Sequence, residues 1–319
     1  MSLHTPICDL FEIEVPIFLA GMSMVASAEV CAAVSEAGGY GVLGMAGADP
    51  DGIRDEMRRV RALTDKPFGV DLLAALPEMV NAAIDVIIDE GASCFAAGLG
   101  VPGPIIEKCH DAGLKVMVVC GKVDHARRSE DAGCDAVIAQ GTEAGGHTGK
   151  VAGMALIPQV VDAVDIPVLG AGSIVDGRGI AAAMALGAQG AWMGTRFIAT
   201  QEATASRGFK EEIVARGGAD TQITRCYSGK PMRVITNPYV EDWEQKPDEI
   251  QRFPDQMVVS MQNNVWGYTS DDDTDRTRTA FPSGQGIGGI EDIPKVADLM
   301  PRLVADTEAA IRRLSPLAP

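Results

Sequence analysis

Residues 136–149 read Ala-Val-Ile-Ala-Gln-Gly-Thr-Glu-Ala-Gly-Gly-His-Thr-Gly, a short apolar run that passes directly into a loop with four glycines and one histidine. Glycine permits backbone angles closed to other residues and lets backbone N–H groups come close to a ligand. His147 is the side chain best able to take and return a proton near neutral pH. Two interpretations are open here: a catalytic loop, or a flexible turn whose histidine caps the following helix.

The same pattern, an apolar run that ends in glycine, recurs twice further along the chain. Residues 167–173 read Pro-Val-Leu-Gly-Ala-Gly-Ser, and residues 191–196 read Ala-Trp-Met-Gly-Thr-Arg. In a (β/α)₈ barrel, the loops after strands 7 and 8 and a nearby helix N-terminus supply the unpaired N–H donors that a phosphate group needs. The three loops together therefore favour the catalytic interpretation, and the later two predict a phosphate site.

A repeated unit organises most of the chain: a helical segment ends at glycine and a short β-rich run follows, as at Gly113 and Gly133. Glycine just past a helix satisfies its last carbonyls, and runs with little alternation are typical of parallel strands buried on both faces. An open doubly wound sheet is the alternative, but its glycine fingerprint after the first strand is missing. The sequence therefore predicts a TIM (β/α)₈ barrel, with strands near 15–20, 40–44, 67–72, 93–97, 115–119, 136–139, 167–170 and 190–194.

Three segments are expected along the chain. Residues 1–216 hold the eight barrel strands, 217–282 form a polar insertion after strand 8, and 283–319 form a C-terminal helix that completes the barrel. The insertion is either a solvated excursion or a lid, since it leaves the end of the barrel where active sites lie. Its aromatic residues either pack it onto the barrel or line the substrate pocket; they are Tyr227, Tyr239, Trp243, Trp266 and Tyr268.

Composition narrows the class of partner. The net charge of −17 argues against nucleic acid and anionic membranes, which are bound by clustered Lys and Arg, so a small-molecule ligand is expected. The start of the chain has neither the basic residues nor the apolar core of a secretory signal, and no run of about 20 apolar residues occurs, which predicts a cytoplasmic protein. Seven cysteines without a Cys-x-x-Cys pair indicate buried free thiols and no metal site. A homodimer is left open.

With these motifs identified, the chain resembles the nitronate monooxygenase family, also called 2-nitropropane dioxygenases, FMN enzymes with flavin-dependent enoyl reductases and quinone reductases among their relatives. The resemblance implies a phosphate held by the loops at Gly172-Ser173 and Gly194-Thr195, and His147 as the catalytic base. It also implies a flavin ring near Met22, Gln140 and Gly145. The remaining residues expected to bind FMN are Ala20, Gly21, Asp71, Gly146, Gly170, Trp192, Met193 and Gln285.

Two departures from the family pattern bear on the cofactor. Asp71 stands where the family typically has asparagine, and a carboxylate there would repel reduced, anionic flavin unless it is protonated or paired. Ser173 stands where many members have a second glycine, and its hydroxyl is a donor that can serve a phosphate. We therefore expect an altered flavin potential and retained phosphate binding.

The resemblance implies oxidation of a nitroalkane or alkyl nitronate, with O₂ or another electron acceptor, after His147 removes the α-proton of a neutral substrate. The alternative is an FMN-dependent dehydrogenase or reductase of an enoyl thioester of CoA or acyl carrier protein, or an NAD(P)H:quinone reductase. A non-enzymatic flavin-binding or sensory protein is disfavoured by the base within the glycine loop. Fold and cofactor site do not fix the substrate.

Overall fold

The computed structural model describes residues 3–75, 77–272 and 274–314, so the outermost residues of the first and last predicted segments lie outside it. Eight parallel strands alternate with helices and pair in the order β1-β9-β8-β6-β5-β4-β3-β2. A parallel bridge between Phe18 and Tyr40 joins the two ends of this order and closes the barrel. The predicted TIM barrel is confirmed. Its strands are β1 (Ile17–Leu19), β2 (Gly41–Gly44), β3 (Phe68–Leu73), β4 (Cys94–Gly98), β5 (Lys115–Cys120), β6 (Ala136–Gln140), β8 (Val168–Ala171) and β9 (Gly190–Met193).

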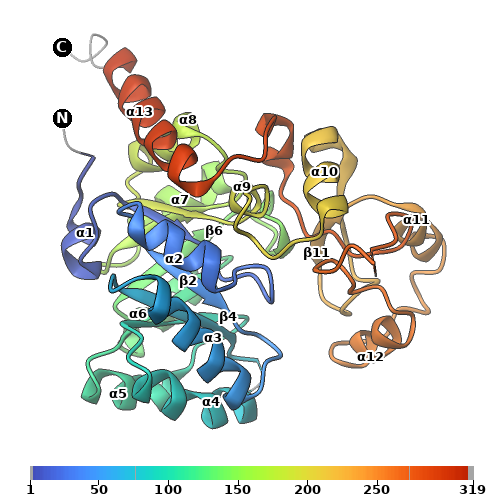
Figure 1. The fold of residues 1–319 in the computed structure, drawn as a ribbon, viewed down its shortest axis with the longest axis horizontal. Helices are drawn as coiled ribbons and strands as arrows, with labels where there is room; N and C mark the ends of the chain where they lie inside the picture. Colours follow the sequence, from blue (N-terminus) through green and yellow to red (C-terminus); the bar gives the residue numbers. More distant parts are fainter. Residues whose placement is uncertain (1–2, 76, 273, 315–319) are drawn as a thin grey trace.

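Helices cover the outside of the barrel (Figure 1). The last of them, α13 (Val296–Leu314), packs against α8 and α2 and so lies where the final helix of the barrel belongs. Gly113 and Gly133, at φ of 80° and 95°, end two of these helices in the left-handed conformation that glycine favours. The other covering helices are α2 (Ala28–Glu36), α3 (Pro50–Leu63), α4 (Pro77–Asp89), α5 (Gly103–Asp111), α6 (Val123–Asp131), α7 (Gly153–Val161) and α8 (Gly177–Ala185).

One apolar cluster fills the inside of the barrel, and a second lies between its strands and the covering helices. Alternate strand residues such as Phe18 point inward, whereas their neighbours Ile17 and Leu19 pack under the helices. The short helix α1 (Pro6–Phe11) closes one end, because Phe11 meets the rings of Phe18 and Tyr40 edge-on, with ring centroids 5.2 and 5.0 Å apart. The closed end leaves the opposite, carboxyl end of the strands for the loops identified in the sequence.

Part of the chain between β9 and α13 forms a small unit beside the barrel, on the side away from α1 (Figure 1). Its strands β10 (Thr221–Thr224) and β11 (Met232–Ile235) form an antiparallel hairpin. β11 also pairs with β7 (Gly146–His147), which belongs to the glycine loop. The remaining elements between β9 and α13 are α9 (Thr195–Ile198), α10 (Arg207–Ala215), η1 (Gly218–Asp220), α11 (Pro238–Glu244), α12 (Asp255–Gln262) and η2 (Gln285–Gly289), of which α9 lies at the barrel.

The aromatic residues of this unit mostly form its own core. Tyr227 is fully buried, stacks on Tyr239 at 5.4 Å and packs against Trp266, while Trp243 packs against Tyr239. Tyr268 instead reaches the barrel, where its hydroxyl donates to the carbonyl of Ser23 at 3.3 Å. The segment is therefore folded around a core rather than a solvated excursion.

Two further features of the described chain bear on the sequence analysis. The seven cysteines are buried thiols, as the sequence predicts. None of the helices in the described ranges has the length and apolar character needed to cross a bilayer.

Candidate active site

The predicted site residues gather at the carboxyl end of the barrel. Residues 20–22 follow β1, Asp71 lies in β3 and Gln140 ends β6. Residues 172–173 follow β8, and residues 194–195 follow β9. Because the strands are parallel, these positions share one end of the sheet. Gly170, Trp192 and Met193 lie within β8 and β9, and Gln285 begins η2.

Ser173 and residues 283–286 tie the glycine loop to the loop after β8. The Ser173 hydroxyl donates to the carbonyl of Glu143 at 2.8 Å and accepts the N–H of Gly286 at 2.9 Å. The N–H of Gln285 donates to the same Glu143 carbonyl at 2.9 Å. Gln285 therefore enters the site through its backbone, and its side chain is exposed.

The hydrogen bonds of the Ser173 hydroxyl change how this residue would serve a phosphate. Its hydroxyl proton goes to Glu143, so the donor that remains is its backbone N–H. Ser173 adopts φ of 55°, the left-handed region where glycine is preferred, and its hydroxyl stabilises that turn through the two hydrogen bonds. Serine at this position thus holds the loop in the shape that a second glycine would otherwise permit.

Unpaired backbone donors lie in the loops after β8 and β9. Within the described ranges, the N–H groups of Ser173, Gly194 and Thr195 have no protein acceptor, and all three residues are half-buried. The Thr195 hydroxyl is held by the N–H of Gly284 at 3.1 Å. Free N–H groups at the start of a helix suit an anion, so these residues fit a flavin phosphate.

The strand ends beside these loops are closely packed. A side chain on Gly21 would overlap the Asp71 side chain, and one on Gly145 would come within 2.9 Å of Ser283 Cα. Ser283 is fully buried, and its hydroxyl has no hydrogen-bond partner in the described chain. Glycine is therefore required at 21 and 145 for these segments of the chain to approach one another.

Asp71 is buried and its carboxyl group accepts no hydrogen bond from the described residues. Burial alone raises the pKa of this carboxyl well above its usual value, because water no longer stabilises the charge. Burial therefore shifts this carboxyl group toward its neutral form, the form that would not repel a reduced, anionic flavin.

His147 is held on both sides. Its carbonyl accepts the Gln140 side-chain amide at 2.7 Å, and its ring Nε2 lies 2.8 Å from the Ser228 hydroxyl. Burial, followed by the positive charge of Lys230, lowers the pKa of His147 to about 4. The ring is therefore neutral at pH 7 and available as a base.

Sequence reasoning missed three residues of the insertion that reach this loop. Ser228 contacts the His147 ring, and Lys230 follows it in the same turn. Arg233 is buried and donates twice to the carbonyl of Thr142, each time at 3.2 Å. The only available signal was the Ser-Gly-Lys turn between two short β-rich runs, which does not reveal what the turn touches.

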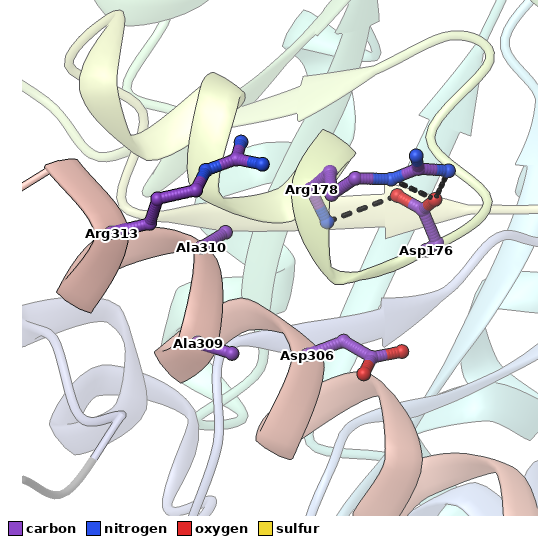
Figure 2. Close-up of a pocket in the computed structure, with 6 residues that line it drawn as sticks. All are labelled: Asp176, Arg178, Asp306, Ala309, Ala310 and Arg313. Carbon is purple, nitrogen blue, oxygen red and sulfur yellow. Dashed lines mark hydrogen bonds and ion pairs between the residues drawn. The ribbon is translucent and has the colours of Figure 1, made fainter.

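A surface pocket between α8 and α13 is separate from this site (Figure 2). Asp176 caps α8 by accepting the N–H groups of Arg178 and Gly179 at 2.9 and 3.0 Å, and it pairs with the Arg178 guanidinium. The charges of Asp176 and Arg178 satisfy one another. Asp176 therefore anchors the helix that follows the loop after β8.

Comparison with known proteins gives consistent matches. A family model described as nitronate monooxygenase matches residues 4–84 and 80–306. The chain is 34% identical over 350 residues to (3aS,4S,5R,7aS)-5-hydroxy-7a-methyl-1-oxo-octahydro-1H-indene-4-carboxyl-CoA dehydrogenase of Rhodococcus jostii, covering 99% of this chain and 98% of that protein. FabK from Thermotoga maritima matches with TM-score 0.92 and 35% identity over 99% and 100% of the two chains. Nitroalkane oxidase from Streptomyces ansochromogenes matches with TM-score 0.86 and 31% identity over 97% and 99%.

Proposed function

We propose that this protein oxidises nitroalkanes or alkyl nitronates with FMN and O₂. The chain belongs to the nitronate monooxygenase family and is a flavin-dependent oxidoreductase. The observation that carries the proposal is His147, a neutral imidazole fixed at the barrel end among loops that offer unpaired N–H donors. A base of this kind suits a substrate whose α-proton is acidic.

The residues present fit FMN in particular. The N–H groups of Ser173, Gly194 and Thr195 would hold its single terminal phosphate. The family resemblance implies a ring near Met22, Gln140 and Gly145. The sequence offers no dinucleotide fingerprint that would favour FAD. When bound, FMN would take electrons from the substrate and return them to O₂ or another acceptor.

The steps that belong to the chain are orientation and proton transfer. The Gln140 amide fixes the backbone of His147, and the β7–β11 pairing fixes its place against the insertion. The neutral ring then takes the α-proton of a bound nitroalkane, and the C–H electron pair remains on the carbon. A nitronate has already lost this proton and needs only binding and orientation.

The second candidate is a dehydrogenase or reductase of a CoA or acyl-carrier-protein thioester. It is favoured by the Rhodococcus relative, whose name states a CoA-ester dehydrogenase and which this chain matches over nearly the whole length of both proteins. His147 suits this chemistry equally, because the carbon beside a thioester carbonyl also bears an acidic proton. Both candidate reactions use the same site geometry, so only a test with the two kinds of substrate can distinguish them.

Anaerobic reduction separates the two candidates. Purified holoprotein is mixed with neutral nitroalkane, nitronate, acyl-CoA thioester or NAD(P)H while the flavin absorbance is followed. We expect the nitro compounds to bleach the flavin fastest. Faster bleaching by acyl-CoA would instead assign the protein to the thioester class. His147→Ala is expected to keep its flavin and slow reduction by the neutral carbon acid by about 10²- to 10⁴-fold. A parent rate in this variant, at matched flavin content, would contradict the assignment of the base.

A further inference from the structure

The turn between β10 and β11 brings a hydroxyl from the insertion onto the base. Ser228 lies 81 residues after His147 in the chain, is 1% exposed, and places its Oγ 2.8 Å from Nε2. The contact is reinforced by the backbone, because Met232 pairs with His147 in the β11–β7 ladder. The N–H of Thr148 also donates to the carbonyl of Pro231 at 3.2 Å.

Helix α12 holds this turn in place through side-chain hydrogen bonds. The Gln256 amide donates to the carbonyl of Cys226 at 2.6 Å, and the Ser260 hydroxyl donates to the carbonyl of Tyr227 at 2.7 Å. A side chain on Gly229 would come within 2.5 Å of the backbone N of Phe253, so the turn lies directly against the loop that leads into α12. Ser228 is therefore presented to the histidine by a rigid support.

The hydrogen bonds around Ser228 Oγ determine where its proton points. A hydroxyl has one proton and two acceptor lone pairs. The Lys230 N–H donates to Oγ at 3.3 Å, and the Lys230 carbonyl lies 3.2 Å away, where it can only accept. All three contacts are satisfied when the hydroxyl donates to this carbonyl and accepts from Nε2–H of His147. The reverse orientation would set lone pair against lone pair at the carbonyl.

We propose that Ser228 is a positioning residue that holds His147 in its Nε2–H tautomer, so that Nδ1 is the atom that takes the substrate α-proton. Within the described residues Nδ1 has no hydrogen-bond partner, which leaves its lone pair available. The proton moves from the α-carbon to Nδ1, and the C–H electron pair stays on the carbon. The Nε2–H group of His147 keeps its hydrogen bond to Ser228 Oγ throughout. The proposal rests on His147 being the base.

The tautomer can be measured without turnover. In oxidised holoprotein with ¹⁵N-labelled histidine, the four histidines are few enough for His147→Ala to identify the His147 ring signals. We expect the parent to show a protonated Nε2 and an unprotonated Nδ1, and Ser228→Ala to move toward the other tautomer. Ser228→Thr keeps a hydroxyl and is expected to keep the parent tautomer. A parent spectrum with the proton on Nδ1, or an unchanged tautomer in Ser228→Ala, would overturn the proposal.

Kinetics give the matching readout. Ser228→Ala is expected to slow flavin reduction by a neutral nitroalkane about tenfold, the usual worth of one hydrogen bond, and to leave reduction by the nitronate unchanged. Ser129→Ala is the matched control, because it also removes a buried serine hydroxyl that donates to a backbone carbonyl, at 2.9 Å, but in α6 away from the site. An equal loss in Ser129→Ala, or an equal loss on nitronate, would show a merely structural effect. A parent rate in His147→Ala would show that His147 is not the base, and would overturn the role of Nδ1 whichever tautomer the spectrum shows.

Discussion

Asp71 is a buried carboxyl group whose ionisation should make the stability of the fold depend on pH. Its carboxyl group is buried without a partner, so its pKa lies well above the usual value and the folded protein binds a proton that the unfolded chain releases. The stability that this proton provides is present below pH 3.8, the unfolded value, and is lost as pH rises toward the folded pKa. Asp71→Asn removes this loss, so its advantage over the parent in free energy of unfolding should grow by up to about 1.4 kcal/mol per pH unit in that window.

The same substitution tests the cofactor assignment. An ionised Asp71 disfavours reduced, anionic flavin, so Asp71→Asn should raise the reduction potential at high pH, with a smaller change at low pH where the parent carboxyl is neutral. Potentiometric titration at several pH values measures both. A potential equal to that of the parent across the range would place Asp71 away from the ring.

The loop after β9 is the element on which phosphate binding depends. Gly194 has φ of −107°, and a Cβ there would meet Met22 Sδ at 3.2 Å and Ala20 Cβ at 3.5 Å, so a small side chain can be accommodated. Gly194→Asp should nevertheless weaken flavin binding by on the order of 3 kcal/mol, because it sets a carboxylate against a phosphate in a half-buried site. Flavin content after purification and equilibrium titration measure the loss. Gly194→Asn is the control with matched size, and similar losses in the two variants would assign the effect to bulk rather than charge.

Across the whole molecule, five of the eight parallel strands were predictable because each is a mostly apolar run introduced by a helix-ending glycine; they are β2, β4, β5, β6 and β9. The placement of loops such as 172–173 and 194–195 at one end follows from that topology alone. The contact between Ser228 and His147 was not predictable. It depends on β7, a strand of two residues in a glycine loop that carries no alternation, pairing with a hairpin more than 80 positions later. The Ser173 hydroxyl likewise looked like a phosphate donor until its protein acceptor, the Glu143 carbonyl, was visible.

The site draws on segments from both halves of the chain, so bound flavin should stabilise the whole fold. A ligand that binds only the folded state at 100 times its Kd adds about 2.7 kcal/mol. For 319 residues, at ~2.1 cal/mol/K of unfolding entropy per residue, this raises Tm by about 4 °C. Removing FMN should therefore lower Tm by that amount in calorimetry, and amide exchange should rise most in residues 141–149, 172–173 and 283–286, which hydrogen bonds link at the barrel end. Riboflavin lacks the phosphate and is expected to restore only part of the shift. Full restoration by riboflavin, or protection confined to the insertion, would contradict a phosphate held between the loops after β8 and β9.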